Sequence, residues 1–385
     1  MGTEPTPGTP GLRVALVCPY SLSRPGGVQG QVIGLARSLE HRGHQVTVFA
    51  PLDDQEDTPI DVDLVAVGRS VALPSNGSVA PVSISPRGAR RALAAVRLGR
   101  FDVVHIHEPF SPGLPYGLLM TRDVPPLVAT FHRSGGSIFY ALLRPLAWGF
   151  ARHIAIRCAV SEAARHTAHL AVGGTYDVLF NGVEIDRYGE AEPWPSEGPT
   201  VLFLGRHEER KGLRVLLEAF ARLEEGPAPG GRVPTLWVAG DGPETDQLQR
   251  WYPGSPTLQW LGVLTEGEKL RRLAAADVLC APSLGGESFG MVLLEAMAAR
   301  TLVVASDIEG YRQAADGHAV LVAPGDAGAL AEALSGVLVQ LADPADPTVG
   351  AIRDAARLRA ENWSMDRLAG RYEEIYRKAM EHPAP

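Results

Sequence analysis

The sequence is short of cysteine, of long apolar runs and of positive charge. Its 385 residues include only Cys18, Cys158 and Cys280, each in or beside a separate strand-like run. Neither disulfides nor a cysteine metal site is indicated, so we expect a reduced, cytoplasmic protein. No apolar run approaches the roughly 20 residues that a membrane-spanning helix needs. Residues 1–11 are rich in Pro, Thr and Gly and lack a signal-peptide core, and we expect them to form a disordered tail.

The formal net charge of −8 at pH 7 argues against nucleic acid as the main partner, because phosphate binding usually leaves a basic balance. The dinucleotide fingerprint G-x-G-x-x-G is also missing, which weakens an oxidoreductase interpretation. The remaining composition, 45% hydrophobic and 21% charged, is that of an ordinary globular protein. A chain of this length exceeds what one core usually organises, so two domains are the simplest expectation.

Short apolar runs alternate with helix-period segments in two series. The first contains LRVALVC, QVTVFA, VDLVAV, DVVHIH and PLVATF, and the second contains TVLFLG, TLWVAG, DVLCAP, TLVVAS and AVLVAP. This rhythm predicts an α/β protein with two parallel sheets covered by helices. Between the series, Gly189–Pro199 is rich in Pro, Gly and Glu, and we place an interdomain hinge near residues 181–199.

Two helices carry clear apolar faces. The segment 28–41 presents Val32, Leu35 and Leu39 on one side and is followed by Gly43 at the position of a C-terminal cap. In the last helix, the apolar stripe consists of Met365, Leu368, Tyr372, Ile375, Tyr376 and Ala379. This stripe needs a partner surface.

The strongest chemical signal is LGGESFGMVLLEAMAA, residues 284–299, directly after a predicted strand. Its glycines and the helix that follows can direct backbone N–H groups at an anionic ligand. Were the segment helical throughout, Glu287 and Glu295 would lie about 12 Å apart, comparable to the span from a ribose to a sugar across a diphosphate. An isolated E-x7-E is more often a capping acid and a surface acid, but the glycines and the strand favour a site.

The GGESFGMVLLEA segment resembles the donor-site signature of retaining glycosyltransferases with the GT-B fold. The motifs PYSLSRPGGVQ, NGSVA, HIHEP, ATFH, NGVEIDRY and FLGR follow in the order and spacing of the phosphatidylinositol mannosyltransferases of family 4. The resemblance implies two Rossmann-like domains whose parallel sheets face across a cleft. The N-terminal acceptor domain would span 12–180 and the nucleotide-sugar domain 181–362, with a helix in 363–385 returning to the first domain.

The resemblance also implies a set of site residues. The catalytic residues would be His132, Arg206, Lys211 and Glu287; the donor-binding residues would be Gly27, Arg206, Lys211, Lys269, Glu287, Ser288, Phe289, Gly290 and Glu295. Arg206 and Lys211 can neutralise a departing diphosphate, the role of a divalent metal in other transferases, so the sequence requires no metal. Gly27 can bring its N–H close to a phosphate, although it could equally form only a tight turn.

Histidines mark the carboxyl ends of two predicted strands. His132 follows PLVATF, where α/β proteins place site residues, although a lone strand-end histidine is more often structural. The resemblance makes it a contact of the transferred sugar and the leaving phosphate. His105 and His107 are expected to be core or supporting residues without a catalytic role.

Enzymes of this type keep the anomeric configuration of the transferred sugar. A carboxylate nucleophile is one route, but no residue is a compelling candidate. The resemblance favours same-face attack, with the departing diphosphate helping to remove the acceptor proton. Asp61 and Asp63 form a D-x-D, a metal motif of a different transferase fold, but they open a strand and a metal role is not favoured.

The acceptor residues implied by the resemblance are Tyr20, Gln29, Asn76, Ser78 and Arg133. Two positions depart from the family: Pro81 stands where a basic residue is expected, and Arg133 substitutes for a lysine. A basic helix carrying Arg87, Arg90, Arg91 and Arg97 suits an anionic membrane surface, although a charge run is usually a solvated face.

Together these expectations describe transfer of mannose from GDP-mannose to phosphatidylinositol, by a peripheral protein on the inner face of the plasma membrane and without a tightly bound cofactor. The alternative is a related transferase that uses a UDP- or GDP-sugar and a soluble acceptor such as inositol phosphate. A non-catalytic nucleotide-sugar sensor is a different class, and the presence of Glu287, Arg206, Lys211 and His132 argues against it.

Overall fold

The computed structural model describes residues 11–24, 26–53, 61–75, 78–133, 149–226, 229–252, 255–287, 289–343, 347–382 and 384. The chain forms two compact units. The first unit contains the described residues up to Gly182 together with those from Met365 onward, and the second unit runs from Val183 to Ser364. The expected domain boundaries, 180/181 and 362/363, each lie two residues before the point at which the chain passes from one unit to the other.

The first unit is built on a seven-stranded parallel sheet in the order β3-β2-β1-β6-β7-β8-β9. Its strands are β1 (Arg13–Val17), β2 (Gln45–Ala50), β3 (Asp63–Ala66), β6 (Val103–His107), β7 (Leu127–Phe131), β8 (Ile154–Ala159) and β9 (Asp177–Val178). The described helices are α1 (Gly27–His41), α2 (Pro86–Leu98), α3 (Leu114–Leu119), α5 (Glu162–Val172) and α14 (Met365–Glu381). The hairpin β4 (Val71–Ser75) and β5 (Ser78–Val82) is antiparallel. All five strands of the first predicted series are confirmed.

The second unit holds a six-stranded parallel sheet in the order β12-β11-β10-β13-β14-β15. Its strands are β10 (Thr200–Leu204), β11 (Thr235–Ala239), β12 (Leu258–Gly262), β13 (Val278–Ala281), β14 (Leu302–Ser306) and β15 (Val320–Val322). Its described helices are α6 (Ile185–Gly189), α7 (Leu213–Glu225), α8 (Thr245–Trp251), α9 (Glu266–Ala275), α10 (Met291–Ala298), α11 (Glu309–Ala315), α12 (Ala327–Leu341) and α13 (Pro347–Glu361). The five strands of the second series are confirmed, and β12 was not predicted.

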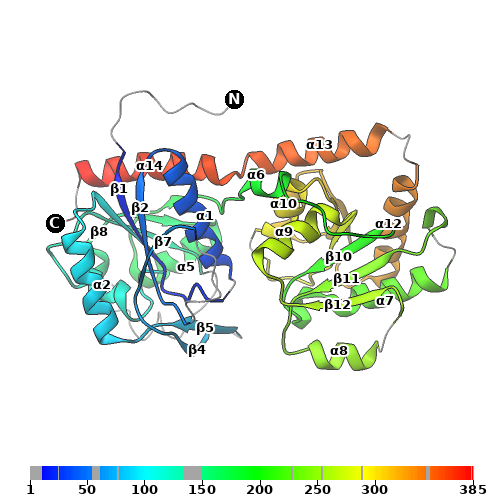
Figure 1. Cartoon of the computed structure of the whole chain (residues 1–385), viewed down its shortest axis with the longest axis horizontal. Helices are drawn as coiled ribbons and strands as arrows, with labels where there is room; N and C mark the ends of the chain where they lie inside the picture. The colour runs from blue at the N-terminus through cyan, green and yellow to red at the C-terminus, as the bar shows by residue number, and fades with distance from the viewer. Residues whose placement is uncertain are drawn as a thin grey trace. The chain divides into compact units, whose positions relative to one another are not determined.

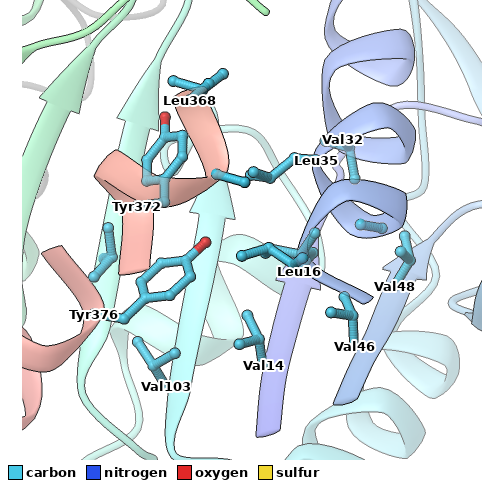
Figure 2. Packing of buried hydrophobic residues seen from close by; sticks show 14 of the residues in the cluster. Val14, Leu16, Val32, Leu35, Val46, Val48, Val103, Leu368, Tyr372 and Tyr376 are labelled. Atoms are coloured by element: carbon cyan, nitrogen blue, oxygen red, sulfur yellow. The ribbon is translucent and has the colours of Figure 1, made fainter. Parts of the chain in front are cut away.

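The C-terminal helix α14 completes the core of the first unit, which supplies the partner surface that its apolar stripe required. It lies beside α1 in Figure 1, where α14 is red and α1 is blue. Its tyrosines Tyr372 and Tyr376 are buried against the sheet and α1, in the same cluster as Val14, Leu35 and Val103 (Figure 2). Because this stripe buries five large side chains, those of Met365, Leu368, Tyr372, Ile375 and Tyr376, it contributes several kcal/mol to the stability of the unit.

Trp194, within the range 181–199 where the hinge was expected, is bound to the second unit. The ring of Trp194 lies 4.2 Å from the guanidinium carbon of Arg272, which also lies 4.2 Å from the ring centre of Trp237. The backbone N–H of Trp194 donates to the carbonyl of Arg271 at 3.0 Å. Aromatic faces attract a cation held between them, so Trp194 packs on α9. The chain passes from the first unit to the second at Gly182, at the start of the expected range.

Candidate active site

Three predicted donor residues of the second unit, Arg206, Lys211 and Glu287, come together at the carboxyl ends of β10 and β13. After β10, a 3-10 turn (Glu209–Lys211) directs cations toward Glu287, which follows β13. The Glu287 Oε1 atom lies 2.6 Å from Lys211 Nζ and 2.9 Å from Arg210 Nη1. Its side chain is only 14% exposed, so these charge-assisted contacts are partly shielded from water.

Two further residues of this cluster were missed in the sequence. Glu208 accepts from Arg206 Nε at 2.6 Å and from Arg210 Nε at 3.0 Å. Three cations and two carboxylates therefore form one connected network. Arg210 bridges the two acids, Glu208 and Glu287. The sequence HEERK does not indicate which acidic side chain each basic side chain will contact.

The second predicted acid, Glu295, lies on α10 and pairs with the predicted Lys269. Lys269 Nζ is 3.3 Å from Glu295 Oε1 and 3.2 Å from Glu266 Oε2, and it lies 5.7 Å from the ring centre of Tyr188. Burial disfavours the ammonium, but Glu295 and its other neighbours outweigh burial and hold the pKa of Lys269 well above its ordinary value. Lys269 is thus a fixed cation that orients Glu295.

The described residues around the two acids do not form a continuous helix. Gly286 has a φ of 74° and Gly290 a φ of 77°, and α10 begins only at Met291. A Cβ on Gly290 would lie 2.8 Å from Cδ1 of the buried Tyr311. The 12 Å axial separation expected for a fully helical segment therefore does not apply, because Glu287 precedes the helix.

A loop after β11 lies against this cluster and was not recognised in the sequence. Gly240 has a φ of 124°, and its Cβ position lies 1.9 Å from the carbonyl oxygen of Gly205, so only glycine fits. The buried His207 contacts Thr245 Oγ1 through Nδ1 at 2.8 Å, and Thr245 donates to Asp241 at 2.7 Å. These bonds fix the loop beside the start of the Arg206–Lys211 turn. The sequence feature that could have indicated this loop is the triplet Gly240-Asp241-Gly242, directly after β11.

In the first unit, the predicted residues lie at the carboxyl ends of β1, β6 and β7. Gly27 is the first residue of α1, and a Cβ there would meet no atom within 4 Å. Gln29 is buried and donates to the carbonyls of Ser21 and Arg24, both at 3.3 Å, so it holds the β1–α1 loop. Burial and the nearby Glu108 carboxylate raise the pKa of Tyr20.

Two consecutive residues hold His132 in place: His107, the last residue of β6, and Glu108, the next residue in the chain. Its ring Nε2 lies 2.8 Å from His107 Nδ1. Its backbone N–H, and that of Arg133, both donate to Glu108 Oε1 at 2.7 Å. Glu108 is itself only 4% exposed and has a φ of 49°, a conformation that is uncommon for a residue other than glycine. The expected contact residue Arg133 is thereby placed next to His132.

The three histidines His105 and His107 of β6 and His132 after β7 are neutral at pH 7. Burial lowers the pKa of His105 to about 3 and that of His132 to about 4, and it holds the pKa of His107 well below its ordinary value. At His105 and His107 the neighbouring imidazoles add to this effect. A neutral imidazole has one N–H donor and one acceptor nitrogen, so each ring must adopt a defined tautomer.

Comparison with known proteins identifies the family. Residues 25–187 match the family model described as Glycosyltransferase Family 4, and residues 198–340 match that described as Glycosyl transferases group 1. The phosphatidyl-myo-inositol mannosyltransferase of Mycolicibacterium smegmatis is 41% identical over 340 residues, which cover 85% of each chain. That of Propionibacterium freudenreichii is 35% identical over 318 residues, 78% of each chain. The chain belongs to glycosyltransferase family 4.

Solved structures agree on the fold of this family 4 glycosyltransferase. A glycosyltransferase from Rickettsia africae superposes with a TM-score of 0.69 at 19% identity, over 96% of this chain and 99% of that one. HepE from Anabaena, solved with UDP and glucose, gives a TM-score of 0.68 at 18% identity, over 94% and 99%. The expected GT-B fold with two Rossmann-like domains is confirmed, and so is the expectation of a glycosyltransferase.

The other residues that the sequence predicted for the site are not part of the clusters described above. Asn76 and Ser288 fall outside the described residues, and Ser78 is placed only as the first residue of β5. Phe289 is buried, with its ring centre 4.6 Å from that of Trp363. Of the D-x-D pair, Asp61 forms an ion pair with Arg37 at 2.6 Å and Asp63 accepts from Thr47 at 2.7 Å. In the described part of the chain, no three acidic, histidine or cysteine side chains gather as a metal site.

The arginines expected to meet a membrane lie on α2. Arg87, Arg90 and Arg91 are exposed, and Arg97 is 46% exposed with a loose contact to Asp123 at 3.7 Å. The last residue of the helix, Leu98, is 82% exposed. Among the described helices, none has the length and apolarity needed to cross a membrane.

Proposed function

We propose that the chain transfers mannose from GDP-mannose to phosphatidylinositol, with retention of the anomeric configuration. The observation that carries this proposal is the convergence of Lys211 and Arg210, which follow β10, with Glu287, which follows β13. The relatives named phosphatidyl-myo-inositol mannosyltransferase, 35–41% identical over most of the chain, support mannose and phosphatidylinositol as the substrates.

The second unit would bind the nucleotide sugar. Arg206, Arg210 and Lys211 supply three positive charges for a diphosphate, and Glu208 and Glu287 hold those cations in place. Charge that develops on the leaving diphosphate is stabilised best by preorganised donors of this kind. Glu287 and Glu295 would accept hydrogen bonds from hydroxyl groups, because a carboxylate has two oxygens that can each accept. HepE, a structural relative, was solved with UDP and glucose.

The first unit would bind the acceptor and contribute His132. Tyr20 and Arg133 lie near Glu108, whose carboxylate fixes the backbone of His132. A neutral His132 is suited to hydrogen bonding with the transferred sugar or the leaving phosphate, since it would not have to lose a proton first. Gly27, at the start of α1, would bring a backbone N–H to a phosphate.

We further propose that α2 docks on the anionic inner face of the plasma membrane. Residues 87, 90, 91, 94 and 98 recur at the spacing that places side chains on one helix face. This face carries three exposed arginines and ends in the exposed Leu98. Cations attract anionic headgroups while an apolar side chain enters the interface, so both features favour peripheral binding.

A radiolabelled transfer assay tests the proposal. The protein is offered GDP- and UDP-linked sugars in parallel, with phosphatidylinositol in vesicles or soluble inositol phosphate as the acceptor, and the products are identified. We expect label to move only from GDP-mannose to phosphatidylinositol, with the α-anomer as product. Transfer to inositol phosphate alone, or from a UDP-sugar alone, would contradict the proposed substrates, and a β-linked product would contradict retention.

A further inference from the structure

The contact between His107 and His132 contains a single proton. His107 Nδ1 and His132 Nε2 lie 2.8 Å apart, and both rings are neutral. One nitrogen must therefore donate and the other accept. Either His107 donates from Nδ1, or His132 donates from Nε2, and the two arrangements place the second proton of each ring differently.

The other nitrogen of His107 decides between these arrangements. His107 Nε2 is buried and has no hydrogen-bond partner among the described residues. If His132 were the donor, His107 would carry its own proton on this Nε2, as an orphaned buried N–H. Such donors are rare in folded proteins because nothing replaces their lost bond to water. If His107 donates from Nδ1, its Nε2 is a bare lone pair and no donor is orphaned.

The ring of His107 is held in place from behind. The His105 ring packs against it, with ring centres 4.3 Å apart and the ring planes inclined by 32°. Both nitrogens of His105 are engaged, Nδ1 with the Tyr376 hydroxyl and Nε2 with Thr130 Oγ1, each at 2.8 Å. Tyr376 comes from α14 and is fully buried (Figure 2). His105 therefore has little freedom to turn, and it limits rotation of His107.

We propose that His107 is a positioning residue for His132 and holds it in the tautomer protonated on Nδ1. His107 Nδ1–H occupies the Nε2 lone pair of His132, and Nδ1–H becomes the only donor of the His132 ring. The sugar is then transferred beside a neutral imidazole whose donor is fixed before the reaction begins. The ring therefore does not have to change its tautomer during the reaction. This inference rests on the proposed role of His132 and specifies its protonation.

The tautomer can be measured without any activity. Full-length protein labelled with nitrogen-15 in its histidines gives long-range proton–nitrogen spectra that distinguish protonated from bare ring nitrogens. The His132 signals are assigned by their loss in His132→Gln, and His166→Gln, on the exposed face of α5, serves as the control. We expect His132 to be protonated on Nδ1 and bare on Nε2 at pH 7. Protonation on Nε2 would overturn the inference, whatever the substrates prove to be.

Two substitutions at His107 test its effect on transfer. The side-chain amide of Asn places an N–H near the position of Nδ1, whereas Leu provides none. We expect His107→Leu to lower kcat by about tenfold to a hundredfold, since loss of orientation costs up to about that factor, with KM for the donor changed less than about twofold. His107→Asn should retain kcat within about threefold. Equal losses in the two variants, or an unchanged kcat in His107→Leu, would contradict the positioning role.

Discussion

Lys211 Nζ lies 2.6 Å from a carboxylate oxygen of Glu287, although the two residues are 76 positions apart in the sequence. Both side chains are largely shielded, 20% and 14% exposed. The pair forms because β10 and β13 are neighbours in a parallel sheet, so the turns that follow them emerge at the same edge. Arg210 adds a second cation to the same oxygen. The acid of the GGESFG segment and the cations of the RHEERKG segment thus belong to one cluster.

Glu287→Ala and Lys211→Ala should each lower transfer by more than about a hundredfold, because the cluster loses either its carboxylate or a cation that stabilises the leaving diphosphate. Lys211→Ala should remain folded, since Arg210 still pairs with Glu287. Transfer of radiolabelled mannose gives the activity, and thermal unfolding checks the fold. Glu218→Ala is the matched control, because Glu218 forms an exposed ion pair with Arg214 on α7, which contributes about 0.5 kcal/mol. Near-normal transfer by both site variants would rule out the donor assignment.

Gly290→Ala should destabilise the second unit and impair donor binding. Gly290 has a φ of 77°, and the new methyl group would lie 2.8 Å from the ring of Tyr311. A left-handed conformation costs a non-glycine residue about 1–2 kcal/mol, and the clash adds to this cost. Denaturant unfolding measures the loss of free energy, and titration with nucleotide measures the weaker binding.

Gly350→Ala provides the matched control for that substitution. Gly350 is exposed within α13, and a Cβ there would meet no atom within 4 Å. Alanine is the better helix former, so this variant should gain about 0.5–1 kcal/mol. If Gly290→Ala were as stable as Gly350→Ala, the turn before α10 would not require glycine.

The parts of the site that could be predicted are those written locally in the sequence. Strands and the faces of α1 and α14 follow from apolar periodicity, and Glu287 was recognisable because glycines and a strand surround it. Pairings between distant segments could not be predicted in the same way. Trp194 stands in a Pro- and Glu-rich stretch typical of a linker, and contacts with the distant residues Arg271 and Arg272 bind the stretch to the second unit.

The His107–His132 contact forms because two strands that are distant in the sequence are neighbours in the sheet. β6 and β7 pair in parallel, with His107 opposite Thr130. Residues just beyond each strand end therefore meet at one edge of the sheet. Sequence patterns predicted both strands and their carboxyl ends, but not that they were neighbours in the sheet. Without that adjacency, His107 was indistinguishable from an ordinary core histidine.

Replacing Arg87, Arg90 and Arg91 with serine should weaken binding to anionic vesicles. Each cation near an anionic surface contributes about 1 kcal/mol, so three substitutions should lower the partition coefficient by about a hundredfold. Flotation with vesicles that contain phosphatidylinositol measures this, and added salt should reduce the difference because it screens the charges.

The matched control removes three exposed arginines from the second unit, Arg222, Arg232 and Arg250. This variant has the same change in net charge as the α2 variant but leaves that helix intact. Equal flotation of the two variants would show that total charge, rather than α2, determines the attraction to the membrane.

The buried histidines His105, His107 and His132 should make the first unit less stable at mildly acidic pH. These residues have lower pKa values when folded than when unfolded, so unfolding takes up protons and the free energy of unfolding falls as the pH falls below 6.5. For His105, with a folded pKa of about 3, the fall in the free energy of unfolding approaches about 1.4 kcal/mol per pH unit below its unfolded pKa.

Hydrogen exchange of the β6 and β7 amides between pH 6.5 and 5, corrected for intrinsic rates, measures this local stability. His105→Gln should flatten the dependence by about that amount, whereas the exposed His166→Gln should not. An unchanged slope in His105→Gln would show that the buried ring is not the group that takes up the proton.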